Sequence, residues 1–243
     1  MSALGFVGGH GMSDLITMDD LSNDEILEIL DTAERLLPVA NGDVYAPLLQ
    51  GKVLGNLFFE NSTRTRMSFE SAMKRLGGEV VNLSSVGSSV AKGETLYDTM
   101  QMVDGYSDIA VIRHPRQGAA QYSADAIGIP ILNAGDGAGN HPTQTMLDLF
   151  TIRQAHGTLD GLNVVLVGDL RYGRTTHSLS HALARFGAKL TLVSPDSLRM
   201  PTEIVGDLQS HDTEVIETED LAGSIADADV IYMTRIQKER FPD

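Results

Sequence analysis

The sequence has 243 residues but no cysteine and no tryptophan. Without cysteine, the chain can form neither a disulfide framework nor a thiolate metal site. No apolar run approaches the length of a membrane-spanning helix, and no basic segment precedes a long apolar run near the N-terminus. These absences predict a soluble cytoplasmic protein with no membrane partner.

Positive charge is also scarce in this chain. Lysine and arginine total 18 against 33 aspartate and glutamate residues, so the formal net charge is -15. Such a surface repels polyanions, which argues against nucleic acid or an anionic membrane as a partner. Any anionic ligand must therefore be captured by a local cluster of donors. The low lysine content and the excess of aspartate over glutamate suggest a salty cytoplasm as habitat.

Short apolar runs alternate along the chain with segments of helical period. This alternation occurs in two series and predicts an α/β fold with two doubly wound parallel sheets. We expect a flexible extension over residues 1–12, a first domain over 13–142 and a second domain over 143–243. An early helix is expected to begin after Ser22 and to end at Pro38.

The most informative local pattern is a strand, a polar turn and a helix between residues 53 and 76. The run 53–59 is largely apolar, and apolar residues recur at helical spacing over 69–76. Hydroxyls and free backbone N–H groups of the turn lie at the positive end of the helix dipole, which favours phosphate as a ligand. The alternative is a simple helix cap with solvated arginines. The candidate phosphate-binding residues are Ser62, Thr63, Arg64 and Thr65.

Three further segments carry candidate site residues. Arg113 ends a predicted strand, where open α/β sheets bind ligands, although a surface salt bridge is the alternative. His141 and Gln144 begin a predicted helix and could equally be ordinary polar residues at a helix start. Ser88 and Lys92 lie in a Gly/Ser-containing loop, which by itself is typical of a surface loop.

Two segments near the C-terminus contain candidate carboxylate ligands. Arg174 lies in the run 168–175, and Arg235 and Gln237 lie in the run 232–240. Arginine binds carboxylates in a bidentate manner, so a pair of arginines suits a dicarboxylate. A nucleotide loop is a weak alternative for the first run, since no Gly-x-Gly-x-x-Gly pattern is present. Solvated side chains in a charged run are the alternative for the second.

The stretch from Phe58 to Glu70 closely resembles the carbamoyl-phosphate motif of the aspartate and ornithine carbamoyltransferases. The other segments follow in family order from about Leu15 to the last residue. The resemblance implies a carbamoyl-phosphate domain followed by an aspartate domain. It also implies that Arg113 binds the carbamoyl oxygen and the phosphate, that His141 donates to the carbamoyl oxygen, and that Gln144 holds the carbamoyl nitrogen.

The resemblance favours an enzyme of the aspartate type over the ornithine type. Arg174, Arg235 and Gln237 would bind L-aspartate, and the ornithine enzymes typically carry asparagine near the first of these positions. The implied reaction makes N-carbamoyl-L-aspartate and phosphate in pyrimidine synthesis and needs no cofactor or metal. The residues expected to act in catalysis are Arg64, Thr65, Arg113 and His141. A carbamoyltransferase for ornithine or another amine, and a non-catalytic binding or assembly module, are the alternatives.

The resemblance also implies an assembly. In the family, a loop matching residues 88–94 reaches a neighbouring active site, so Ser88 and Lys92 would act in the adjacent subunit of a homotrimer. A separate regulatory chain is a further expected partner. The family continues beyond Asp243 with a His-Pro-Leu-Pro loop and a terminal helix, so we expect the second domain to be incomplete.

Overall fold

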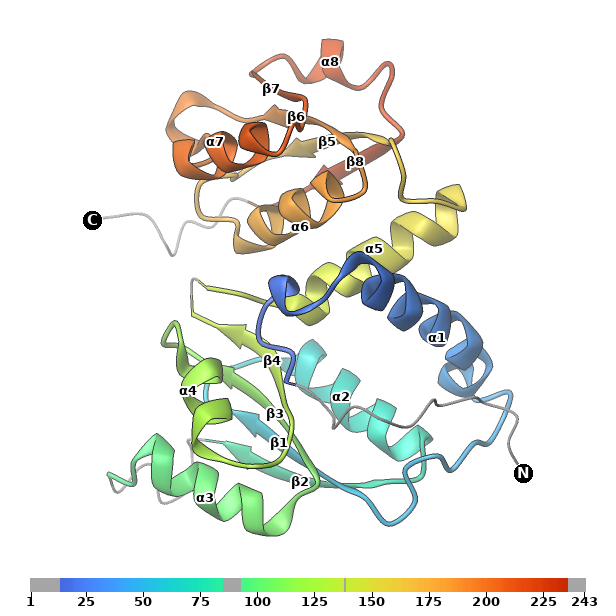
Figure 1. Ribbon diagram of the computed structural model, residues 1–243, viewed down its shortest axis with the longest axis vertical. Coiled ribbons are helices and arrows are strands. Elements are labelled where there is room, and N and C mark those ends of the chain that lie inside the picture. The colour runs from blue at the N-terminus through green and yellow to red at the C-terminus, as the bar shows by residue number, and fades with distance from the viewer. Residues whose placement is uncertain (1–13, 85–92, 138, 236–243) are drawn as a thin grey trace.

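The computed structural model describes residues 14–84, 93–137 and 139–235, and Figure 1 shows that these residues form two sheets, one above the other. Each sheet has four strands and every pairing within it is parallel. The prediction of two doubly wound parallel sheets is confirmed. The strands are β1 (Val53–Phe58), β2 (Glu79–Ser84), β3 (Ile109–His114), β4 (Ile131–Asp136), β5 (Asn163–Val167), β6 (Lys189–Val193), β7 (Val215–Thr218) and β8 (Val230–Met233).

The helices connect these strands and pack on the sheets. They are α1 (Asn23–Asn41), α2 (Thr63–Arg75), α3 (Leu96–Tyr106), α4 (Ala119–Ala126), α5 (Pro142–His156), α6 (Arg174–Ala184), α7 (Thr202–Ser210) and α8 (Leu221–Ser224), with 3-10 turns η1 (Met18–Asp20) and η3 (Asp196–Leu198). Parallel strands need such a connection, because the chain must return to the end of the sheet where the previous strand began before the next strand can start.

Strand order defines where each sheet can hold a ligand. The first sheet has the order β2-β1-β3-β4, so the chain leaves β1 toward one side and returns to the other side with β3. The second has the order β7-β6-β5-β8 and reverses in the same way between β5 and β8. Ligands of open α/β sheets bind at the carboxyl ends of strands beside such a reversal.

The core of the first sheet has two sides, because successive strand residues point to opposite faces. On β3, Val111 belongs to a cluster with Met73 of α2, whereas Ile112 belongs to a cluster with Met100 of α3. Figure 1 shows α3 and α4 on one face of this sheet and α2 on the other. The sheet is thus fixed between two helical layers, which hold the carboxyl ends of its strands in place.

Helices α1 and α5 join the two halves of the molecule. Figure 1 shows them packed against each other between the two sheets. Ile26 and Leu30 of α1 are buried in one cluster with Leu149 of α5 and Leu166 of β5. Helix α1 precedes the first sheet in sequence but therefore packs into the core of the second. The boundary after residue 142 stays a prediction.

Arg185 strengthens this junction from the C-terminal end of α6. Its guanidinium donates to the carbonyl oxygens of Met18 and Leu21 over 3.1 and 2.6 Å, and to the side chain of Asn23 over 2.8 Å. A guanidinium presents several fixed donors at once, so three bonds tie the start of α1 to α6.

The N-terminus of α1 follows the expected pattern, but its C-terminus does not. Ser22 and Glu25 form the predicted capping box. The prediction that Pro38 ends the helix is wrong, since α1 continues to Asn41. Proline removes only one helical N–H donor, and here it lies in the last turns of the helix. The helix ends at Gly42, whose φ of 87° is left-handed and whose N–H bonds back to the carbonyl of Val39.

Two strands of the first sheet also differ from the sequence reading. The pattern did not reveal β2, because this edge strand is largely exposed and contains Glu79 and Asn82 among its apolar residues. Strand β4 extends to Asp136, whereas the apolar run in the sequence predicts a strand only from Ile129 to Asn133. Ala134 and Gly135 therefore lie at the carboxyl end of β4, where both are close to the side chain of Arg113.

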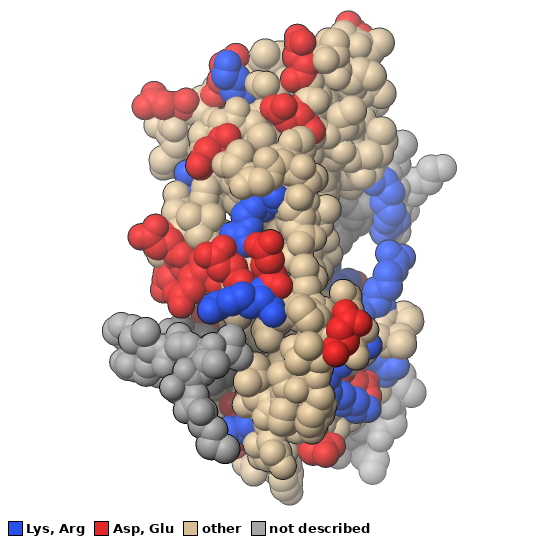
Figure 2. All heavy atoms as spheres, turned by 90° about the vertical axis from the view of Figure 1, so that its right-hand side faces the viewer, with Lys and Arg blue, Asp and Glu red and all other residues tan. Residues whose placement is uncertain are grey.

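Figure 2 shows acidic side chains gathered on one face of the molecule, over α1. Asp24, Glu28, Asp31 and Glu34 line a shallow depression there, together with Arg35. Arg153 of α5 pairs with Asp31 over 2.6 Å and with Glu34 over 3.4 Å. This face would repel an anionic substrate, so capture of an anion depends on a separate cluster of arginines.

Candidate functional site

The polar turn after β1 leads directly into α2, as the sequence predicts. Ser62 occupies the N-cap position with extended backbone, but its side chain makes no capping hydrogen bond to the described backbone. The first turn of α2, all of which is described, contains no acidic side chain. The N–H groups and positive dipole end of α2 are therefore not neutralised by its own residues. The simple-cap alternative does not explain Ser62.

The start of α2 faces the start of α5 across a groove of about 760 Å³. Thr63, Arg64 and Thr65 line one side, and His141 and Gln144 line the other. Five of the predicted ligands of carbamoyl phosphate thus share one depression. The remaining wall is formed by Met67, Ser68, Phe69, Ser71, Ala72, Thr143 and Leu147.

Arg113 lies near the carboxyl end of β3, with its side chain only 13% exposed. Its Nη1 donates to the carbonyl oxygen of Ala134 over 3.3 Å, and its Nη2 lies 3.4 Å from Oε1 of Glu60. Among the described residues, the buried Nε of Arg113 and Oε2 of Glu60 have no hydrogen-bond partner. The salt bridge of the alternative interpretation therefore exists, but Arg113 is half-buried rather than on the surface, and its guanidinium is only partly satisfied by hydrogen bonds.

Arg174, from the second half of the molecule, also lies at the carboxyl end of the first sheet. It is the first residue of α6, is 8% exposed, and donates to the carbonyl oxygen of Gly137. Gly135 lies beside both arginines: a Cβ atom placed there would be 3.0 Å from Nη2 of Arg174 and 3.4 Å from Nη1 of Arg113. Two guanidinium groups, one from β3 and one from α6, consequently flank one glycine.

His141 lies beside these two arginines and is 7% exposed. Burial, together with the charges of Arg174 and Arg113, lowers the pKa of His141 to about 3. The imidazole is therefore neutral near pH 7. Its Nδ1 lies 3.3 Å from the hydroxyl oxygen of Thr143. When that hydroxyl donates to Nδ1, the ring proton is on Nε2, which can then donate to a ligand.

Gln144 lies one helical turn before Asp148 on α5. Its Nε2 donates to Oδ1 of Asp148 over 3.0 Å, and the phenol of Tyr232 donates to Oδ2 over 3.1 Å. Burial raises the pKa of the Asp148 carboxyl, and these two donors act in the opposite direction. Tyr232 belongs to β8, so the carboxylate links the first turns of α5 to the second sheet.

The reversal between β5 and β8 brings the two C-terminal runs together. Gly168 has a φ of +118°, and a Cβ atom there would collide with the carbonyl oxygen of Thr234. Thr234 in turn donates its backbone N–H to Val167 over 2.8 Å. Only glycine permits this close approach, which places the run containing Arg174 beside the end of β8. Arg235 follows there and is exposed.

Several predictions lie outside the described residues. These are the extension 1–12, Ser88 and Lys92 of the predicted intersubunit loop, and Gln237 of the predicted aspartate site.

Sequence reasoning also missed residues that the structure places in the site. Glu60 lies within the predicted phosphate stretch, but its pairing with Arg113 depends on the β1–β3 contact. Asp148 had a local signal, since it lies four residues after Gln144 on the same face of a helix. Gly135 had none, because its role arises from two distant arginines.

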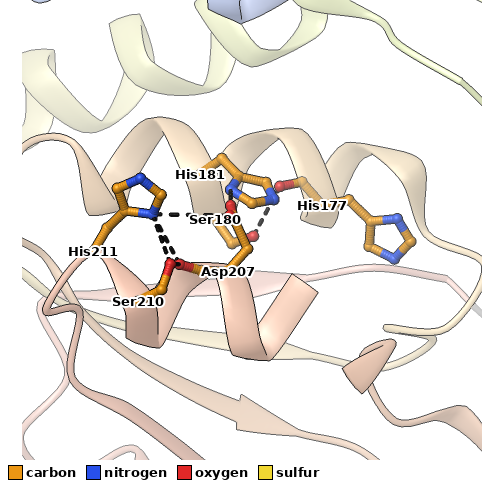
Figure 3. A network of polar contacts seen from close by, with 6 residues as sticks. All are labelled: His177, Ser180, His181, Asp207, Ser210 and His211. Atoms are coloured by element: carbon orange, nitrogen blue, oxygen red, sulfur yellow. Dashed lines mark hydrogen bonds and ion pairs between the residues drawn. The ribbon is translucent and has the colours of Figure 1, made fainter. Parts of the chain in front are cut away.

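A second polar cluster joins α6 to α7 and is shown in Figure 3. His181 Nδ1 lies 3.2 Å from Oδ2 of Asp207, and His211 Nδ1 lies 3.9 Å from Oδ1 of the same carboxylate. Ser210 also bonds to the backbone of Asp207. In the described part of the chain, no group of three or more His, Cys, Asp or Glu residues could hold a metal ion. We assign this cluster to helix packing.

No helix among the described residues is long and apolar enough to cross a membrane.

Both halves of the chain match known protein domains. Residues 13–154 match the carbamoyl-P binding domain of the aspartate/ornithine carbamoyltransferases, and residues 160–242 match their Asp/Orn binding domain. The chain belongs to the aspartate/ornithine carbamoyltransferase family. The resemblance noted in the sequence is thereby confirmed.

Similar relatives within this family are named as aspartate carbamoyltransferases. The aspartate carbamoyltransferase catalytic subunit of Methanococcoides burtonii is 56% identical over 230 residues, which are 94% of this chain and 74% of the relative. That of Thermococcus kodakarensis is 54% identical, over 95% of this chain and 74% of the relative.

Solved structures show the same fold. The catalytic subunit of M. jannaschii aspartate transcarbamoylase has a TM-score of 0.90 at 51% identity, over 96% of this chain and 76% of that chain. Aspartate transcarbamoylase from Trypanosoma cruzi, in complex with carbamoyl phosphate and aspartate, has a TM-score of 0.89 at 42% identity, over 94% of this chain and 74% of that chain.

Proposed function

We propose that this protein transfers the carbamoyl group of carbamoyl phosphate to the amino group of L-aspartate, giving N-carbamoyl-L-aspartate and phosphate in pyrimidine synthesis. The observation that carries this proposal is the meeting of Arg113 and Arg174, one from each half of the molecule, beside the neutral His141. Both substrates are anionic, and both must be held together for reaction. The names of the relatives favour aspartate as acceptor.

The phosphate group of the donor substrate is assigned to the start of α2. Ser62, Thr63, Arg64 and Thr65 would bind it through hydroxyls, backbone N–H groups and one guanidinium. The uncapped helix end supports this assignment, because an anion there satisfies N–H groups that the helix leaves open. Gln144 would hold the carbamoyl nitrogen, as its place across the groove permits.

Catalysis rests on stabilising the charge that develops on the carbamoyl oxygen. The aspartate amine attacks the carbamoyl carbon, the new C–N bond forms, and the C–O bond to phosphate breaks. Thr65, Arg113 and His141 would donate to the oxyanion in between, and Arg64 would stabilise the leaving phosphate. The departing phosphate accepts the amine proton, so we assign no protein base, nucleophile or cofactor.

The acceptor L-aspartate is assigned to the edge of the second sheet. Arg174 and Arg235 would bind its carboxylates, and Gln237 would contact its amino-bearing end. To bind substrate, Arg174 would share or release its hydrogen bond to Gly137. In a cytoplasmic homotrimer, Ser88 and Lys92 of a neighbouring subunit would complete the site, and a separate regulatory chain is a further proposed partner.

The deciding experiment is product analysis with purified protein. Carbamoyl phosphate is supplied with L-aspartate or, in parallel, with L-ornithine, at low salt and in molar KCl. Carbamoyl-aspartate alone is the expected product. Carbamoyl-ornithine would contradict the assignment of Arg174 and Arg235, and silence with both amines from folded protein would support a non-catalytic binding module.

A further inference from the structure

The hydrogen bond between Gln144 and Asp148 determines how the carboxamide of Gln144 is oriented. An ionised carboxylate only accepts hydrogen bonds, whereas a carboxamide has one donating and one accepting end. Because Nε2 of Gln144 faces Oδ1 of Asp148, the accepting Oε1 must point elsewhere. The orientation of an amide is set by its partners, and here the partner allows only one.

Tyr232 keeps this carboxylate in place from the opposite side. Burial and the neighbouring Asp148 raise the pKa of Tyr232 to about 12, so the phenol stays protonated near pH 7 and donates to Oδ2. Both oxygens of Asp148 are therefore occupied by donors, one from α5 and one from β8.

Building on the proposed function, we propose that Asp148 is a positioning residue that turns Oε1 of Gln144 toward the substrate and so selects a carbamoyl group over an acyl group. The carbamoyl nitrogen carries N–H donors, whereas the methyl group of acetyl phosphate carries none. The two molecules otherwise present the same phosphate and carbonyl groups. A site that offers an acceptor at this point rejects the analogue that leaves it unpaired.

Asp148→Asn tests this idea with almost no change in volume. The new amide can donate as well as accept, so it no longer dictates which end of Gln144 faces it. We expect the selectivity, defined as the Kd of acetyl phosphate divided by the Kd of carbamoyl phosphate, to fall by about tenfold. The loss should come from carbamoyl phosphate, with the Kd of acetyl phosphate within about twofold of the wild-type value.

Asp125→Asn is a matched control. Gln121 donates to Asp125 over 2.8 Å with the same four-residue spacing, but on the exposed surface of α4. This variant should keep the wild-type selectivity. Calorimetric titration of each protein with each ligand measures both constants without requiring turnover, and melting temperatures report folding.

A double-mutant cycle separates positioning from general support. Gln144→Ala removes the acceptor, so adding Asp148→Asn to it should cause no further loss of selectivity. Tyr232→Phe offers a gentler test, since it removes one of the two donors to Asp148; we expect a loss of selectivity of about twofold to threefold.

Two results would overturn the proposal: an unchanged selectivity in folded Asp148→Asn, including the case in which both ligands weaken equally, or a wild-type protein that does not prefer carbamoyl phosphate. If Asp148→Asn does not fold, an unchanged ratio in Tyr232→Phe would also overturn it. Turnover by the wild-type protein is measured separately, because it tests the proposed reaction. If the wild-type protein turns over but Asp148→Asn has the same selectivity as wild type, only this inference is refuted. If the selectivities differ as expected but the wild-type protein shows no turnover, only the proposed reaction is refuted.

Discussion

The guanidinium of Arg174 donates a hydrogen bond to the carbonyl oxygen of Gly137. Arg174 begins α6 beside the second sheet, and Gly137 follows β4 of the first. The bond therefore brings a cation from one half of the molecule to the edge where Arg113 of the other half lies. Two like charges gather there, and an anionic ligand would offset their repulsion. The site is complete only when both halves are packed together.

Gly135→Ala should disturb this pair of arginines. The φ of +117° at this position favours glycine, and an added Cβ would lie 3.0 Å from Arg174 and 3.4 Å from Arg113. We expect a stability loss of about 1–3 kcal/mol and a decrease of about tenfold in kcat/KM. Gly161→Ala separates the two effects, because its φ is also positive but nothing lies within 4 Å. It should lose stability only, and equal kinetic losses in both variants would contradict the crowding argument.

Ser62→Ala and Ser22→Ala should have opposite consequences. Ser22 caps α1 through a capping box, so its loss should cost about 1 kcal/mol of unfolding free energy and leave phosphate binding unchanged. Ser62 makes no capping bond, so its loss should cost less than about 0.5 kcal/mol but weaken phosphate binding severalfold. Urea unfolding and titration with inorganic phosphate measure the two effects. A large stability loss in Ser62→Ala would show that its hydroxyl serves the helix.

His141 should make the protein sensitive to acid. Its pKa is about 3 in the folded state, below the ordinary value of 6.5. Between these values the unfolded chain binds a proton that the folded chain does not, so stability falls as pH falls. The slope from this group reaches at most about 1.4 kcal/mol per pH unit.

His141→Gln should flatten that slope between about pH 6 and 4, because glutamine does not titrate. Urea unfolding at a series of pH values gives the unfolding free energies of both proteins. If the two curves run parallel over this range, the burial and charge argument for His141 fails.

Arg235→Ala and Arg64→Ala should separate the two substrates. Arg235 follows β8 at the proposed aspartate site, so its loss should raise the KM for aspartate by about tenfold or more. Arg64 lies in the first turn of α2, and its loss should lower kcat strongly because the charge of the leaving phosphate is left unpaired. Steady-state kinetics with each substrate varied in turn measures both. An unchanged KM for aspartate, or near-normal turnover without Arg64, would refute the respective assignment.

The parts of the site that could be predicted from the sequence are local ones. The turn from Ser62 to Thr65 was readable because an apolar strand and a helical period flank it, and both are short-range patterns. Ser22 with Glu25 was readable for the same reason. Pro38 does not end the helix, because a proline near a helix end costs less than one in the middle. The pattern does not reveal strand β2, because an exposed edge strand lacks a continuous apolar run.

By itself, the sequence determined the alternation of strands and helices, the turn that can hold phosphate and the arginines that can hold carboxylates, since each depends on neighbours within a few residues. Only the tertiary structure decided that α1 packs into the core of the second sheet, that Arg113 and Arg174 flank Gly135, and that Tyr232 bonds to Asp148, 84 residues away. Such contacts depend on how sheets and helices bury their apolar faces together, and burial is a property of the whole packed chain.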